Sequence, residues 1–472
     1  MSFEEPASPS HLPLSRILRC QHLHMGFAEK SFYILRRDLL IHGTQIVTGA
    51  VIARSLGPAA MGLWIILLMI PSYAEPIGRL QVDTASVYAL GTGKYRLGEV
   101  AFALLVITLL SAGLVVGLFL LNRNWLFRTF LAEAAGVPQY VYLMLAYFPV
   151  KFVVLNYSYL LLFLEDVRGF NTVALLLNLV PSVSGALLVW ATNLSILGLV
   201  LSLLGGAIAA LTYAALRIHK VEPLIVHANL PLMKELLLFG LRLYFLSLIA
   251  YFHVYVSSLL VVLYLPPQEV AFFRLGQERA LLLTKIPSAV GTLLYTRVAR
   301  LADEPEKARA LAATSFRLTF LLLLVIGALG AAIAKPAIWM LYGSAFEGVV
   351  LPLSIFIPAV IADTSSGLLT QYFVGRGRLG ILLAMATISL LTQVTLLSLA
   401  VPRWSVVGAA CSILAVYLVT MAMRIAVFSA TEGGSLRELL LFQRGDIAFL
   451  WGVATSQFQS AMRLVLRQGA AR

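Results

Sequence analysis

The chain has 472 residues, of which 60% are hydrophobic and only 12% are charged, and its formal net charge is +13. An ordinary soluble domain carries about 25% charged residues, and a soluble fold of this length has no interior large enough to hide so much apolar surface. A mean hydropathy of +0.90 therefore excludes a soluble enzyme and predicts an all-α protein that crosses a lipid bilayer many times.

In a soluble protein, a net charge of +13 would suggest binding to nucleic acid. In a membrane protein the same excess is explained by Lys and Arg gathering in cytoplasmic loops, so no nucleic-acid partner is expected. The two cysteines, Cys20 and Cys411, cannot build a disulfide framework or a metal cluster. No metal site and no catalytic residue are predicted. Residues 1–36 lack the pattern of a cleavable signal peptide and are expected to form a cytoplasmic tail.

About twelve stretches are long and apolar enough to span a bilayer, which takes about 20 residues each. They are residues 37–55, 60–80, 99–121, 139–163, 171–191, 195–217, 236–263, 274–297, 312–334, 348–372, 379–401 and 405–428. Placing the N-terminus in the cytoplasm leaves few basic residues outside, which predicts that both termini are cytoplasmic. The basic residues left on the outer side are Arg54, Arg123, Arg128, Lys335 and Arg403.

The segments group into two predicted lobes of six helices, residues 37–217 and 236–428, joined by a cytoplasmic linker at 218–235. The prolines Pro58 and Pro267 lie 209 positions apart (267 − 58), and so do Pro149 and Pro358 (358 − 149). Equal offsets predict a parallel repeat of two six-helix bundles around a central cavity, an architecture of several secondary transporters. Residues 429–472 are expected to form an amphipathic cytoplasmic tail on the inner leaflet.

Charged residues inside the predicted spans are candidates for function, because a charge near the bilayer centre costs about 2.5–3.5 kcal/mol on insertion scales. In segment eight, Arg274, Glu278 and Lys285 fall within about 40° of one another on a continuous helix. Segment seven carries Arg242 and His253. The remaining candidates are Lys151 in segment four, Arg79 and Asp83 as an i,i+4 pair near the end of segment two, Arg54 after segment one, and Asp363 in segment ten.

Two interpretations of these residues stay open. Lys151, Arg242, Arg274 and Lys285 can line a cationic cavity that binds phosphate or diphosphate, or some of them can be snorkelling side chains and structural ion pairs. Lys151 and Lys285 favour the first interpretation, because they lie deep and have no acid adjacent to them in the sequence. Arg54, Arg79 and Arg274, near predicted interfaces, favour the second.

The interpretation of Glu278, His253 and Asp363 is also open. Glu278 can pair with Arg274 or carry a proton, and His253 and Asp363 are candidates for ion coupling. Two apparent nucleotide motifs fail. The stretch Gly375–Gly380 fits GxGxxG but has no strand before it, and Gly91–Lys94 lacks the first glycine and the Ser/Thr of a phosphate loop.

The stretch Ala53–Trp64 reads Ala-Arg-Ser-Leu-Gly-Pro-Ala-Ala-Met-Gly-Leu-Trp. It resembles the signature Ala-Arg-x-Leu-Gly-Pro-x-x-x-Gly-x-(aromatic) of polysaccharide transporters, the O-antigen and exopolysaccharide flippases. These belong to the multidrug/oligosaccharidyl-lipid/polysaccharide exporter superfamily. The second-lobe counterpart Leu265–Phe273 departs from the pattern, with Pro266 and Ala271 in place of glycines.

This resemblance implies alternating access between two lobes in the cell inner membrane. The substrate it implies is a lipid-linked anionic oligosaccharide on undecaprenyl diphosphate, with other polysaccharide-assembly proteins as partners. It implies no cofactor, but a coupling ion, H⁺ or Na⁺. The second hypothesis is an ion-coupled small-molecule exporter of the same superfamily, and the third is a membrane-embedded glycosyl polymerase or ligase. The excess of basic residues in the spans disfavours the former, and the short outer loops disfavour the latter.

Overall fold

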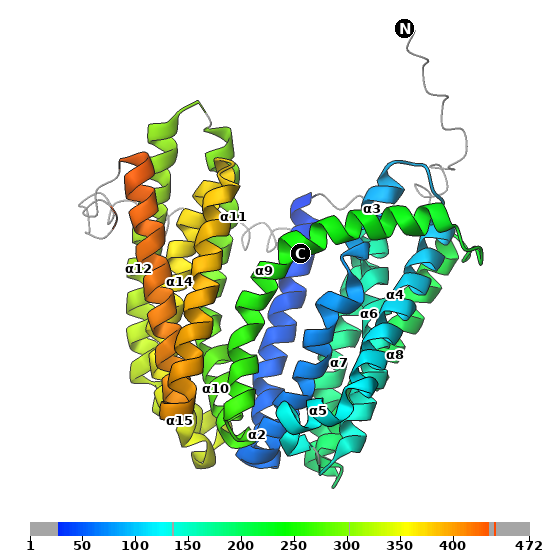
Figure 1. Ribbon diagram of the computed structural model, residues 1–472, viewed down its shortest axis with the longest axis horizontal. Helices are drawn as coiled ribbons and strands as arrows, with labels where there is room; N and C mark the ends of the chain where they lie inside the picture. Colours follow the sequence, from blue (N-terminus) through cyan, green and yellow to red (C-terminus); the bar gives the residue numbers. More distant parts are fainter. Residues whose placement is uncertain (1–26, 135, 302, 434–438, 440–472) are drawn as a thin grey trace, which may run out of the picture. The chain divides into compact units, whose positions relative to one another are not determined.

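The computed structural model describes residues 27–134, 136–301, 303–433 and 439, and this part of the chain is nearly all helical and contains no strand (Figure 1). The predicted amphipathic tail at 429–472 lies almost wholly outside these residues, as does most of the predicted N-terminal tail. The helices of the first half are α2 (Phe27–Arg79), α3 (Val82–Gly91), α4 (Leu97–Leu121), α5 (Arg123–Thr129), η1 (Ala132–Ala134), α6 (Pro138–Phe163), α7 (Val167–Ala191) and α8 (Ser195–Val221). Those that follow are α9 (Leu230–Tyr264), α10 (Pro267–Ala280), η2 (Leu281–Thr284), α11 (Lys285–Arg300), α12 (Pro305–Ala332), α13 (Ala334–Tyr342), η3 (Ser344–Val349), α14 (Val350–Gly375) and α15 (Leu379–Glu432).

Eight helical stretches among the described residues are long and apolar enough to cross a membrane, and the protein is a multi-pass membrane protein. Two of them, Arg36–Gly91 and Gly380–Glu432, exceed 50 residues and each contains two of the predicted segments. The predicted segments 236–263 and 274–297, which correspond to α9 and to α10 with α11, are not among the eight. The all-helical, polytopic fold class is confirmed, and the count of twelve stays a prediction.

Backbone breaks divide the two longest helices at the predicted places. Gly57 in α2 has φ of 76°, a left-handed conformation that glycine adopts without steric cost. Pro58 follows as the first residue of the next helical stretch, where its missing N–H is not needed. In α15 the break falls at Ser405, with φ of 54°. Each break separates two predicted segments.

The first compact unit comprises residues up to Arg274 together with Pro336–Val349. Its core lies among α3, α4, α6, α8 and the first part of α9, where Val100, Leu104, Leu160 and Ala214 are fully buried. The sequence assigned α9 to the second lobe, whereas contacts place it in this unit. The predicted lobe boundaries stay a prediction.

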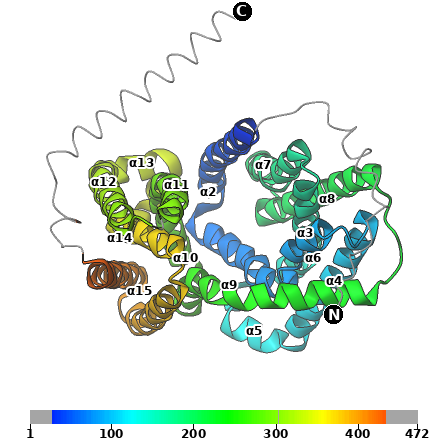
Figure 2. The same ribbon diagram turned by 90° about the horizontal axis from the view of Figure 1, so that it is seen from above.

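The first part of α9 crosses over α3 and the start of α4, as both views show (Figures 1 and 2). Gly240 allows this approach, because a Cβ on it would lie 2.5 Å from the carbonyl oxygen of Leu80. The rings of Phe239 and Tyr88 stack with centroids 4.6 Å apart. Glu235 accepts a hydrogen bond from the Tyr95 hydroxyl at 2.6 Å and pairs with Lys94 at 3.2 Å. These contacts fix the helix across the end of the unit.

The second unit comprises Leu275–Lys335 and the chain from Val350 onward. Its core gathers aromatic side chains of α12, α14 and α15, among them Phe316, Tyr372, Phe373 and Phe428. The rings of Tyr372 and Phe428 meet edge to face with centroids 5.2 Å apart. Such pairs prefer this geometry because the ring edge is positive and the face negative.

Helix boundaries repeat at the offset that the prolines predict. Shifted by 209 positions, α4 would run over 306–330 and α3 would end at residue 300, close to α12 (Pro305–Ala332) and the end of α11 at Arg300. The prolines inside α6 and α14, Pro149 and Pro358, obey the same offset. The internal repeat is therefore visible in the helix boundaries as well as in the sequence.

Candidate functional site

Four charged side chains meet between α2, α3 and α6 in the first unit. Glu75 accepts a hydrogen bond from Arg79 Nη1 at 2.9 Å through one carboxylate oxygen, and from Lys151 Nζ at 3.0 Å through the other. Arg79 also pairs with Asp83. We call Glu75, Arg79, Asp83 and Lys151 the charged cluster. Its two cations and two anions balance.

A break between two helices brings the cluster together. The helix α2 ends at Arg79, and the next two residues, Leu80 and Gln81, have positive φ values of 49° and 56°. Asp83 follows in the first turn of α3, so the Arg79–Asp83 pair spans the break. Lys151 reaches the cluster from α6, two residues after Pro149.

The cluster is partly accessible and firmly supported. The side chain of Asp83 is 3% exposed, whereas those of Glu75 and Lys151 are 19% and 22% exposed. Arg79 Nε also donates to Asn156 Oδ1 at 3.4 Å, and Asn156 in turn donates to Thr108 Oγ1 at 2.7 Å. Because Arg79 is fixed from several sides, we expect Lys151 and Glu75 to be the members that a ligand or proton reaches.

The structure confirms one prediction for these residues and adds an ion-pair partner that was not predicted. The predicted i,i+4 pair of Arg79 and Asp83 forms. Lys151 has no acid adjacent to it in the sequence, but in the fold Glu75 contacts it from 76 positions earlier in the chain. Glu75 was missed, although its spacing of four residues from Arg79 offered a signal. The wall around Lys151 is thus charge-balanced rather than purely cationic.

The other candidates of the first unit lie on α9 and α10 or cap a neighbouring helix. Arg274 Nη1 donates to the hydroxyl of buried Ser258 at 3.2 Å. Arg242 is exposed at the part of α9 that crosses α3, and His253 is half-buried further along the helix. Arg54 donates to the carbonyl oxygens of Met340 at 2.5 Å and Leu341 at 3.0 Å. Its cation thus meets the negative end of the α13 dipole, which supports the structural interpretation.

Two candidates of the second unit lie on either side of a helix interruption. Glu278 and Lys285 are both exposed, but the 3₁₀ turn at Leu281–Thr284 separates them. A 3₁₀ turn has 3.0 residues per turn, so four residues shift the following side chains by about 80° relative to a continuous α-helix. The predicted single face of Arg274, Glu278 and Lys285 is therefore wrong for Lys285.

Asp363 forms an ion pair in the second unit. Arg424 Nη1 of α15 donates to the Asp363 carboxylate at 2.9 Å, to its backbone carbonyl at 2.9 Å and to Ser366 Oγ at 2.8 Å. The partner lies 61 positions away, beyond the reach of any local sequence pattern. Asp363 thus links α14 to α15.

The charged cluster has no counterpart in the second half of the repeat. The residues 209 positions after Glu75 and Lys151 are Thr284 and Val360, which carry no charge. A charge inside a span is costly unless it is paired, so a purely architectural requirement would recur in both halves. Its presence in one half only makes the cluster a candidate functional site. Among the described residues, no group of three or more His, Cys, Asp and Glu is arranged to hold a metal.

A family model described as polysaccharide biosynthesis protein matches residues 27–295, more than half of the chain. The chain belongs to this family. The resemblance found in the signature at Ala53–Trp64 is thereby confirmed. No curated protein matches the sequence.

Solved structures of transporters share the fold. The inward closed conformation of the lipid II flippase MurJ is similar with a TM-score of 0.69 and 10% identity over 90% of this chain and 92% of that one. An inward-facing multidrug resistance MATE family transporter of the MOP superfamily matches with a TM-score of 0.62 and 16% identity, over 89% and 99% of the two chains. A mutant of the Vibrio cholerae MATE transporter VcmN matches with a TM-score of 0.54 and 15% identity over 90% and 98%. At these identities the likeness establishes the fold alone.

Proposed function

We propose that the protein is a flippase that moves a polyprenyl-diphosphate-linked oligosaccharide from the cytoplasmic to the outer leaflet by alternating access, for surface polysaccharide or exopolysaccharide assembly. The observation that carries the proposal is membership of the polysaccharide biosynthesis family by a chain with this transporter fold. A sugar precursor made inside the cell must cross the membrane to reach the surface. One protein of similar fold is a lipid II flippase, so the fold is compatible with moving a lipid between leaflets. The protein then resides in the inner membrane with both termini in the cytoplasm, beside other polysaccharide-assembly proteins.

In this proposal the charged cluster couples substrate transport to the binding of a proton. Glu75 contacts both Lys151 and Arg79, so a proton on its carboxylate would weaken both ion pairs at once. The released Lys151 ammonium then binds the diphosphate, since Lys and Arg are natural phosphate ligands. Arg242, Arg274 and Lys285 remain the further cations proposed to bind diphosphate and acidic sugars. In this scheme the coupling ion is H⁺.

The proposal is tested by deleting the chain in its native host and assaying the sidedness of extracted lipid-linked oligosaccharides. We expect completed units to accumulate on the cytoplasmic face and surface polysaccharide to be lost. Normal surface polysaccharide without accumulation, in a host with no redundant flippase, would overturn the proposal.

A double substitution tests the cations. Replacing Lys151 and Lys285 together by Ala should abolish export while membrane levels of the protein stay normal, whereas Lys151→Arg, which keeps the charge, should retain export. Wild-type export by the double variant would remove these residues from the binding site.

A small-molecule exporter of the same superfamily is the second candidate. One observation favours it, because the first unit contains a cavity of about 550 Å³ with an almost wholly apolar lining. That volume lies within the range of about 300–1,000 Å³ typical of small-ligand pockets. The deletion experiment separates the candidates, since an exporter of this kind would leave lipid-linked oligosaccharides unchanged.

A further inference from the structure

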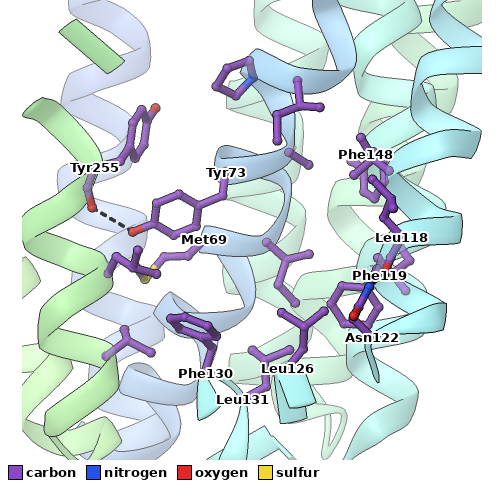
Figure 3. A pocket seen from close by; sticks show the side chains of 18 of the residues that line it. Met69, Tyr73, Leu118, Phe119, Asn122, Leu126, Phe130, Leu131, Phe148 and Tyr255 are labelled. Atoms are coloured by element: carbon purple, nitrogen blue, oxygen red, sulfur yellow. Dashed lines mark hydrogen bonds between the residues drawn. The ribbon is translucent and has the colours of Figure 1, made fainter. Parts of the chain in front are cut away.

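The apolar cavity of the first unit is separate from the charged cluster. It lies among α2, α4, α5, α6 and α9 (Figure 3), and we call it the alcove. Its walls are mostly large aromatic and aliphatic side chains, including Tyr73, Phe119, Phe130, Phe148 and Tyr255. Beyond one asparagine, the indole N–H of one tryptophan and the tyrosine hydroxyls, the lining side chains are apolar.

Helical spacing on α2 explains why the alcove and the cluster are distinct. Ile66, Met69, Tyr73 and Ile77 recur at intervals of three or four residues, so they share one face of the helix. Glu75 lies two residues after Tyr73 and therefore points about 200° away from it. One helix thus presents an apolar wall on one side and a charged group on the other.

Contacts between α2 and α9 define one wall of the alcove. The Tyr73 hydroxyl donates to the backbone carbonyl of Tyr255 at 2.9 Å, and the two rings meet edge to face at 5.5 Å (Figure 3). The Tyr251 ring stacks on Tyr255 at 5.0 Å. Because its hydroxyl is hydrogen-bonded to Tyr255, Tyr73 contributes an apolar ring to the wall of the alcove.

The alcove is open at its surface. Ile77, Leu118 and Phe252 line it and are 48%, 49% and 54% exposed, although each belongs to a helix of a membrane protein. An apolar ligand can therefore reach these side chains without unfolding any helix.

The apolar lining of the alcove on α2 is not repeated at three equivalent positions of the second half. Three of its lining positions on α2 are apolar, and their counterparts 209 positions later carry charges. The residues 209 positions after Met69, Ile70 and Pro76 are Glu278, Arg279 and Lys285. The fold itself therefore does not require an apolar surface at this place.

We infer that the alcove binds a segment of the isoprenoid chain of a polyprenyl-diphosphate-linked substrate. The inference rests on the proposed function, because only that function supplies a substrate with a long hydrocarbon chain. While the sugar moiety moves through the protein, the chain must stay in apolar surroundings. In lipid no hydrophobic force drives it onto protein, so a concave wall gains its preference through van der Waals packing. Aromatic walls around a cavity supply such packing on several sides of one chain.

Crosslinking tests where the chain lies. The photoreactive residue p-benzoylphenylalanine is placed at Leu118 in the alcove or at Leu110, which is 66% exposed on the same helix and does not line it. The full-length protein in vesicles of defined phospholipid is irradiated with radiolabelled polyprenyl-diphosphate oligosaccharide. We expect labelling at 118 and none above background at 110. Equal labelling at both positions, or crosslinks at 118 to phospholipid alone, would overturn the inference.

Filling the alcove gives an independent test in the same vesicles. Leu118→Trp should slow translocation of a long-chain substrate about tenfold, the effect of about 1.4 kcal/mol, and should slow a short-chain analogue much less. The matched variant Leu110→Trp should translocate both as wild type does. Wild-type protein that translocates neither substrate would refute the proposed function itself. Translocation by Leu118→Trp at wild-type rates for both chains would refute the alcove as the chain site and leave the function standing.

Discussion

Glu75 connects the two cations of the charged cluster, since each of its carboxylate oxygens accepts from a different one. The substitution Glu75→Gln keeps the size of the side chain and removes its charge, as a bound proton would. We expect transport by this variant to lose its dependence on a pH gradient, while its amount in the membrane is unchanged. The measurement is translocation in vesicles with and without an imposed gradient.

Glu99→Gln is the matched control, because Glu99 lies in the first turn of α4 and outside the cluster. It should respond to the gradient as the wild type does. If Glu75→Gln also responds normally, Glu75 is not the coupling residue.

Gly62 in the family signature lies directly against the second copy of that motif. A Cβ at Gly62 would come 1.7 Å from the carbonyl oxygen of Pro267, a distance that no contact tolerates. The backbone must therefore shift in Gly62→Ala, and overpacking of this kind costs about 1–3 kcal/mol. We expect a lower melting temperature in detergent. Gly49→Ala in the same helix meets nothing within 4 Å and should melt no lower than wild type.

Sequence reasoning at this scale found local pairs and missed distant ones. Arg79 and Asp83 are four positions apart, so helical periodicity was enough to pair them. Lys151 with Glu75 and Asp363 with Arg424 join different helices, and no pattern within one helix says which other helix it faces. The candidate residues were thus partly found, whereas their ion-pair partners were not.

At the scale of elements, α9 begins earlier than its predicted span. One span was expected at 236–263, but the helix runs over Leu230–Tyr264 and its first part packs across α3. Asn229 is the N-cap of α9, because its side chain accepts a hydrogen bond from the Leu232 amide. The Gly57-Pro58 pair marks the break in α2 in the sequence, whereas the break in α15 at Ser405 has no such glycine to mark it.

We expect the contact of α9 with the α3–α4 loop to depend on pH. The hydrogen bond from Tyr95 and then that from Lys94 lower the pKa of Glu235 below its ordinary 4.5. A lowered folded-state pKa means that this contribution to stability is present above about pH 4.5 and is lost as pH falls through the folded-state value. We expect the protection of amides over 230–242, measured relative to the intrinsic exchange rate at each pH, to fall on acidification and to be low already at neutral pH in Glu235→Gln. Lys234→Gln, next to it and exposed, should exchange like wild type. Unchanged exchange in Glu235→Gln would contradict this role.

At the scale of the whole molecule, the repeat and the fold class could be predicted because both depend on composition and on two proline offsets. The sequence could not predict which half carries the charged cluster and which carries the alcove, because both depend on how side chains of separate helices meet. The two halves share an order of helices but carry different side chains at equivalent positions. Met69 with Glu278 and Glu75 with Thr284 illustrate the exchange.

The predicted orientation is testable at the two ends of α8. The exposed native Cys411 is first replaced by Ser, together with Cys20, to remove background labelling. Asn193→Cys and Lys220→Cys then place single thiols at exposed positions near the start and end of α8 (Ser195–Val221). An impermeant maleimide added to intact cells should label 193 and leave 220 unlabelled until the cells are opened. The reverse pattern would invert the topology derived from the basic loops.

The hydrogen bonds from Arg54 to the carbonyls of residues 340 and 341 have a consequence for biosynthesis. The first unit is discontinuous, because it needs Pro336–Val349 as well as the chain up to Arg274. While the ribosome is still synthesising the intervening residues, Arg54 lacks the acceptors that it has in the finished protein. The earliest helices to enter the membrane are therefore among the last to complete their contacts, and a chain released before residue 336 would leave the first unit unfinished.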